Sequence, residues 1–167
     1  MKYLRVPIQQ EDIDQLQVGD MVSISGDIYA GRDAVLPKLI RRITEDGDEA
    51  LWQRIQGGVI FHTAVSVAGV GPTSSNKLEI ESSIVPLSEL GVKIHLGKGA
   101  IGPSTIEGLE KNNAVFAVIP PVTALLNSKI REQEVVAFPE EGMEALHRLA
   151  MENVTVIIAA AHGKSIY

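Results

Sequence analysis

The sequence of 167 residues contains no cysteine. A disulfide, a thiolate nucleophile, a cysteine-based zinc site and a thiolate-ligated iron–sulfur cluster therefore cannot come from this chain. Any cofactor that needs thiolate ligands has to be held by a partner protein.

Long apolar runs and an excess of positive charge are missing as well. No run of about 18 apolar residues exists, which argues against a membrane-spanning helix, and the start, Met1–Pro7, lacks the apolar segment of a signal peptide. The formal net charge is −6 at pH 7, whereas nucleic-acid binding needs clustered basic residues. We therefore expect a soluble cytoplasmic protein with no nucleic-acid or membrane partner.

Aromatic residues make up only 4% of the chain, whereas apolar residues make up 45%. The core should therefore be aliphatic and close-packed. A length of 167 residues suits one domain with its own core, and no repeat, low-complexity segment or linker divides the chain. We expect a single domain over residues 1–167.

Apolar periodicity predicts strands that alternate with helices. Met21–Tyr29 alternates as a half-buried strand does, and Val59–Ala68 reads as a fully buried one. Further strands are expected at 2–8, 92–96, 114–119, 134–138 and 154–159, and helical segments at 11–17, 36–43, 48–56, 75–90 and 104–112. This order predicts an α/β fold with a mixed, largely parallel sheet.

Two helix starts are expected from local signals. Ser104 and Glu107 have the spacing of a capping box after Pro103. Pro139 is expected to begin a helix that carries four apolar residues on one face: Met143, Leu146, Leu149 and Ala150.

Three loops, each just after a predicted strand, carry the candidate binding residues. The first is Ala30–Asp33, the second is the glycine-rich turn Gly69–Lys77, and the third is Leu96–Gly99. Such turns present backbone N–H groups, hydroxyls and cations at the carboxyl ends of strands, where α/β sheets bind ligands. The candidate residues are Arg32, Gly71, Thr73, Ser74, Lys77 and Lys98, and together they suit a small dicarboxylate.

Each candidate also has a purely structural interpretation. Arg32 pairs with its neighbour Asp33 in that interpretation, while Thr73 and the serines after it cap a helix. The two lysines would then be solvated surface residues.

The four histidines show no metal-ligand spacing, so no metal site is expected. His62 and His95 fall within predicted strands and are expected to be satisfied core residues. His147 is expected on the flank of the helix that starts at Pro139.

At the level of motifs, the chain resembles the β subunit, or C-terminal domain, of class I fumarate hydratases and the related L-tartrate dehydratases. The resemblance covers nearly the whole chain, and the Gly-Arg-Asp-Ala and Gly-Pro-Thr-x-Ser motifs are its most specific parts. The matching segments are 18–20, 25–34, 71–75, 97–99, 142–146 and 163–167.

This resemblance implies a three-layer, swivelling β/β/α domain and an iron–sulfur hydro-lyase that hydrates fumarate to malate, a step of the tricarboxylic acid cycle, or dehydrates tartrate. It implies a [4Fe-4S] cluster held by a cysteine-bearing α subunit, and none bound by this chain. Arg32, Lys77 and Lys98 would bind substrate carboxylates with the N–H groups of Gly71 and Ser74, and Thr73 would move the proton. The assembly is expected to be a hetero-oligomer, or a homodimer when the chain is isolated.

The chain departs from the family pattern in four places, the mildest of which is Ser74 in place of the family's second threonine. Lys77 stands where the family usually has arginine, Val35–Pro37 replaces a segment with histidine and lysine, and Phe61–Ala64 lacks the usual Gly-Pro. Two rival roles follow: a non-catalytic binding or assembly protein of the same fold, and the small-subunit role of an aconitase-like enzyme acting on a longer substrate.

Overall fold

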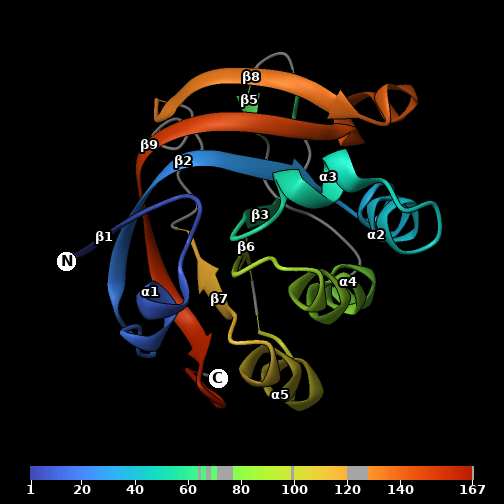
Figure 1. Cartoon of the computed structure of the whole chain (residues 1–167). Helices are drawn as coiled ribbons and strands as arrows, with labels where there is room; N and C mark the ends of the chain where they lie inside the picture. Colours follow the sequence, from blue (N-terminus) through green and yellow to red (C-terminus); the bar gives the residue numbers. More distant parts are fainter. Residues whose placement is uncertain (64, 67–68, 71–76, 99, 120–127, 167) are drawn as a thin grey trace.

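The computed structural model describes residues 1–63, 65–66, 69–70, 77–98, 100–119 and 128–166. Figure 1 shows the order of its elements. They are β1 (Lys2–Arg5), α1 (Gln10–Asp14), β2 (Met21–Gly31), α2 (Leu36–Thr44), α3 (Glu49–Arg54), β3 (Val59–His62), β4 (Val65–Ser66), β5 (Gly69–Val70), α4 (Lys77–Glu89), β6 (Ile94–Gly97), α5 (Pro103–Lys111), β7 (Val115–Val118), β8 (Ile130–Ala137), the 3₁₀ helix η1 (Pro139–Glu144), β9 (Leu146–Ala161) and β10 (Lys164–Ser165).

The main sheet of the described chain has eight strands and is mixed. Strands β1, β2, β3, β6 and β7 pair in parallel, in that order. Strand β9 is antiparallel to β2, β7, β8 and β10, and the pairings β2–β3–β6–β7–β9–β2 form a closed ring. The α/β class is confirmed, but the expectation of a largely parallel sheet is wrong, because one long strand contributes an antiparallel pairing to each of four neighbours.

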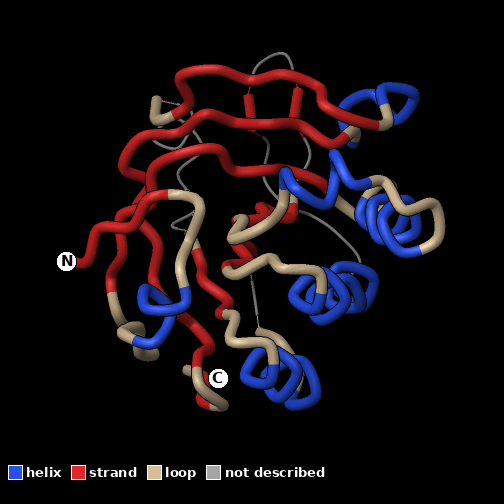
Figure 2. The backbone as a smooth tube through the Cα atoms, in the orientation of Figure 1, coloured by secondary structure: helices blue, strands red, loops and turns tan. Residues whose placement is uncertain are grey.

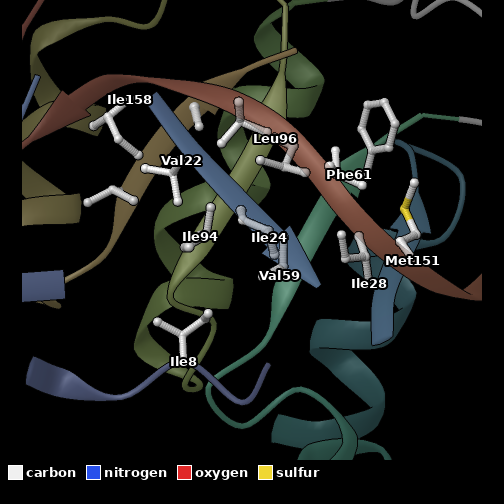
Figure 3. Close-up of a cluster of buried hydrophobic side chains, with 14 of the residues drawn as sticks. Ile8, Val22, Ile24, Ile28, Val59, Phe61, Ile94, Leu96, Met151 and Ile158 are labelled. Carbon is white, nitrogen blue, oxygen red and sulfur yellow. The ribbon is translucent and has the colours of Figure 1, made fainter. Parts of the chain in front are cut away.

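The largest core cluster joins the five strands of this ring. Val22, Val59, Ile94, Val115 and Val156 come from β2, β3, β6, β7 and β9, and each is fully buried. Figure 3 shows part of this cluster between the strands. The cluster is aliphatic apart from one phenylalanine, Phe61, as the composition predicted. Burying this much apolar surface is the main favourable contribution to folding.

Helices α2 to α5 lie along one side of the strands, whereas α1 lies on the other side (Figure 2). Two further core clusters join these helices to the sheet. One packs Leu36 and Leu39 of α2 against Ile60 of β3, and the other packs Leu109 of α5 against Phe116 of β7. Among the described residues, no helix is long and apolar enough to cross a membrane.

The helix predicted to start at Pro139 is wrong. Residues 139–144 form only a short 3₁₀ segment, and β9 begins at Leu146. Leu146 packs in the cluster that joins α2 to β3, and Leu149 packs in the largest cluster inside the ring of strands. Both faces of this part of β9 are therefore covered. A strand buried on both faces lacks the alternation that would reveal it. His147 accordingly lies on β9, not on a helix flank.

The start of α5 also differs from its prediction. Gly102 is the N-cap and Pro103 the first helical residue, so Ser104 and Glu107 do not form a capping box. Glu81 of α4 accepts hydrogen bonds from the Gly102 amide and the Thr105 hydroxyl instead, at 3.1 and 2.8 Å. A carboxylate from another helix therefore caps α5, which a local sequence pattern could not reveal.

Arg148 of β9 connects three strands through ion pairs. Its guanidinium donates to Asp27 of β2 at 2.9 Å and to Glu132 and Glu134 of β8 at 2.9 and 2.6 Å. These hydrogen bonds raise the pKa of Arg148, so it stays charged. The β2–β9 register shifts just before Asp27, between Ile24 and Gly26, which marks a β-bulge or similar irregularity in this pairing.

A buried polar chain connects β3, β6 and α4. The Nε2 atom of His62 lies 3.1 Å from Nδ1 of His95, and Nε2 of His95 lies 2.9 Å from the Ser88 hydroxyl. Ser88 donates its only hydroxyl proton to the Ile84 carbonyl, at 2.8 Å. Ser88 must therefore accept from His95, which in turn must accept from Nε2–H of His62. This leaves Nδ1 of His62 without a proton, and it has no hydrogen-bond partner in the described structure.

Both imidazoles are neutral at pH 7 because they are buried. Burial lowers the pKa of His62 from 6.5 to about 4, and burial together with His62 lowers the pKa of His95. The prediction that these two residues belong to the core is confirmed, but only His95 uses both ring nitrogens.

We predict that this pair makes the protein less stable in mild acid. As pH falls from 6.5 towards 4, the unfolded chain binds a proton at His62 that the folded chain does not, so the free energy of unfolding falls by about 1 kcal/mol per pH unit. His95, whose pKa is also lowered, adds a contribution of the same sign. Denaturant unfolding at several pH values should show this slope, and it should become shallower in His62→Phe. The exposed His162→Gln variant is the control. An unchanged slope in His62→Phe would contradict the assignment.

Candidate functional site

Four parallel strands end at one edge of the sheet. Strand β2 ends at Gly31, β3 at His62, β6 at Gly97 and β7 at Val118. Gly31 is paired with His62, and Gly97 with Val118. Because parallel strands in register share their carboxyl ends, the loops that follow them leave from the same edge.

Two of the predicted cations lie at this edge. Arg32 directly follows β2 and Lys98 directly follows β6, with β3 between these strands. Neighbouring strands are about 4.8 Å apart, so the two strand ends are about 10 Å apart across β3. Two long cationic side chains separated in this way could hold the two ends of a small dicarboxylate.

Arg32 is mostly buried and lies near two carboxylates. Its Nε atom is 3.7 Å from Asp33 and 3.8 Å from Glu144 at the end of η1, and its side chain is 18% exposed. The pairing with Asp33 agrees with the structural interpretation of the Gly-Arg-Asp loop. Glu144 was missed as a neighbour of this site because its segment was predicted to be the middle of a helix.

Lys98 is exposed, in contrast to Arg32. It follows Gly97, where an added Cβ would lie 3.3 Å from two ring atoms of Phe116. The glycine therefore lets β6 run close over the phenylalanine ring up to its last residue. The lysine ammonium is then presented to solvent at the edge of the sheet.

The remaining predicted residues cannot be placed in the same way. Gly71, Thr73 and Ser74 lie outside the described residues. Lys77 is the first residue of α4. The segment that connects the parallel strands β3 and β6 contains α4. The connection leads from the edge where β3 ends back to the opposite edge where β6 begins, so α4 starts on the side of the first edge.

His62 is a residue of this edge that the sequence analysis did not select. It is the last residue of β3, it is 1% exposed, and it faces Gly31 across the pairing of β2 with β3. Its unprotonated Nδ1 atom is buried without a hydrogen-bond partner in the described part of the chain. A polar residue that ends a buried strand directly before the glycine-rich turn was the available signal.

The described residues contain no group of three or more histidine, aspartate or glutamate side chains that could hold a metal ion. With no cysteine in the sequence, the residues of this chain do not fit an iron–sulfur cluster. What the described edge can do chemically is bind negative charge and accept hydrogen bonds.

Comparison with known proteins agrees with the motif resemblance. The β subunit of L(+)-tartrate dehydratase from Escherichia coli K12 is 33% identical over 156 residues, which cover 85% of this chain and 73% of the relative. The "Putative L(+)-tartrate dehydratase subunit beta" of Methanocaldococcus jannaschii is 28% identical over an alignment of 182 positions, which covers 100% of this chain and 91% of the relative. The "Putative fumarate hydratase class I" of Geobacillus stearothermophilus is 29% identical over an alignment of 177 positions, which covers 98% of this chain but 33% of that longer protein.

The model of the family described as Fumarase C-terminus matches residues 2–167. Because this match includes all the strands that build the edge as well as Arg32 and Lys98, the chain belongs to the Fumarase C-terminus family.

Proposed function

We propose that the chain is the β subunit of a hydro-lyase that reversibly adds water to fumarate or removes it from tartrate. The observation that carries the proposal is the placement of Arg32 and Lys98 at the ends of β2 and β6, one strand apart, in a chain that matches the Fumarase C-terminus over residues 2–167. The names of the relatives, tartrate dehydratase and fumarate hydratase, support this reaction class.

The cations bind the substrate and stabilise charge. Hydration of a double bond next to a carboxylate places negative charge on that carboxylate when the neighbouring carbon loses or gains its proton. Arg32 binds one carboxylate and Lys98 the other, and Lys77 with the N–H groups of Gly71 and Ser74 completes the binding. Mostly buried Arg32 acts at lower local dielectric than exposed Lys98, so its interaction is the stronger of the two.

Thr73 is the group that we propose transfers the proton at the carbon next to a carboxylate. A threonine hydroxyl is a weak base, so this role needs positive charge close by. The three cations proposed for substrate binding, Arg32, Lys77 and Lys98, supply that charge.

The rest of the catalytic machinery belongs to a partner. The name "subunit beta" of two relatives supports a hetero-oligomer with a cysteine-bearing α subunit. The cluster that such a subunit holds would act as a Lewis acid, and no step of this chain's own chemistry is assigned to it. We propose that the chain is a swivelling domain of this assembly and that the assembly is cytoplasmic.

A non-catalytic binding role is the second candidate. The two carboxylates near Arg32, Asp33 and Glu144, favour it, because they already neutralise the cation that would bind substrate.

We predict that activity depends on the partner subunit. The isolated chain should show no hydration of fumarate and no dehydration of L-malate or L-tartrate. Activity should appear when it is reconstituted anaerobically with the α subunit, measured by the absorbance of fumarate for the first two reactions and by the formation of the 2-oxo acid for L-tartrate. Reconstitution without turnover of any of these acids would favour the binding role.

We predict that turnover depends on the planar guanidinium of Arg32. Arg32→Lys keeps the charge but loses the planar fork, so kcat/KM in the reconstituted complex should fall by about 100-fold. Arg41→Lys is the matched control, because Arg41 is an exposed residue of α2. Equal activity of both variants would remove Arg32 from the site.

We predict that proton transfer depends on the hydroxyl of Thr73. Thr73→Ala should lower kcat by about 100-fold or more while Thr73→Ser retains most of it, because only the serine keeps a hydroxyl. Exchange of the substrate C–H with deuterium oxide should be lost in parallel. Near-normal exchange in Thr73→Ala would show that another group moves the proton.

A further inference from the structure

His62 occupies the centre of the edge that holds the two cations. Strand β3 lies between β2 and β6, and His62 is its last residue. It is paired with Gly31, the residue before Arg32. On its other side the parallel register continues one position beyond the Phe61–Leu96 pair, which places His62 beside Gly97, the residue before Lys98. A ligand that contacts Arg32 and Lys98 therefore has to pass over the end of β3.

The hydrogen-bond chain behind His62 fixes which nitrogen it presents. Ser88 uses its proton on the Ile84 carbonyl, which makes His95 a donor through Nε2 and an acceptor through Nδ1. His62 must then donate through Nε2 to His95, at 3.1 Å. Its Nδ1 atom is left as a buried acceptor that nothing in the described structure uses.

An unused buried acceptor destabilises a folded protein, so its presence needs an explanation. Burial also makes the lone pair selective, because it attracts a neutral donor such as a hydroxyl and repels a carboxylate. The cations at the flanking strand ends have the opposite preference. The edge thus has cations that favour carboxylates after β2 and β6, and at the end of β3 between them a buried acceptor that favours a hydroxyl.

We propose that His62 is a specificity-determining residue that accepts a hydrogen bond from the hydroxyl of a small hydroxy acid bound between Arg32 and Lys98. The proposal rests on the function proposed above, which supplies the substrate class. His95 and Ser88 are positioning residues, since they hold the imidazole of His62 in the accepting tautomer without reaching the ligand.

The direct test observes the nitrogen itself. The full-length, ¹⁵N-labelled chain is titrated with L-malate or L-tartrate, and the imidazole nitrogens are followed by long-range ¹H–¹⁵N correlation spectra. The Nδ1 signal of His62, assigned by its loss in His62→Phe, should show an unused lone pair in the free chain and move upfield with either hydroxy acid. Succinate, which lacks the hydroxyl, and the signals of His162 are the controls.

A kinetic test separates specificity from a structural role. In the reconstituted complex, His62→Phe should raise the KM for L-malate by about tenfold and leave the KM for fumarate within about twofold, because only malate carries the hydroxyl. His62→Gln offers both an amide donor towards His95 and an acceptor oxygen, and it should restore most of the affinity for malate.

Three results would overturn the proposal: a His62 Nδ1 that is already protonated or hydrogen-bonded in the free chain, a signal that responds equally to succinate, and an equal rise of both KM values in His62→Phe. If the wild-type complex turns over no acid, the proposed function fails, and the nitrogen spectra alone decide whether His62 binds a hydroxy acid.

Discussion

The pairing of β9 with both β2 and β7 is the constraint on which the rest of the structure depends. These two antiparallel pairings close the ring that surrounds the central core, and within that ring they fix β2 and β7 at the two ends of the parallel row β2–β3–β6–β7. Strand β3 and strand β6 fill that row, so their carboxyl ends must lie at the edge where β2 ends. The β2–β3 and β3–β6 pairings thus set the separation of Arg32 and Lys98.

The sequence predicted the parallel part of the fold well because each element there has a strong local signal. The predicted strand at 92–96 is β6 (Ile94–Gly97), and α2 has one apolar and one basic face. The strand predicted over Val59–Ala68 begins correctly after a glycine turn but ends at His62 as β3. The antiparallel part failed where burial on two faces removed the period of two from β9, as at Leu146 and Leu149. The capping of α5 failed for a different reason, since its partner Glu81 is distant in sequence.

For the candidate site, sequence reasoning selected Arg32 and Lys98 but not the contacts that the residues of this edge make. Arg32 and Lys98 could be selected because each follows a strand in a glycine-containing turn, and the topology brings both to one edge. The pairing of Arg32 with Glu144 depends on where η1 packs, which no local pattern encodes. The accepting state of His62 depends on a proton count over Ser88 and His95, residues that meet only in the folded chain.

The unequal exposure of Arg32 and Lys98 would also give the two ends of a dianion bound as proposed different surroundings. Dissolved salt weakens the attraction to the exposed ammonium far more than to the sheltered guanidinium. The ammonium would accordingly be the first point of encounter for such a ligand arriving from solution and the first to release it. A molecule with two chemically distinct ends would enter this edge in one orientation, so the difference in burial sets a direction of approach.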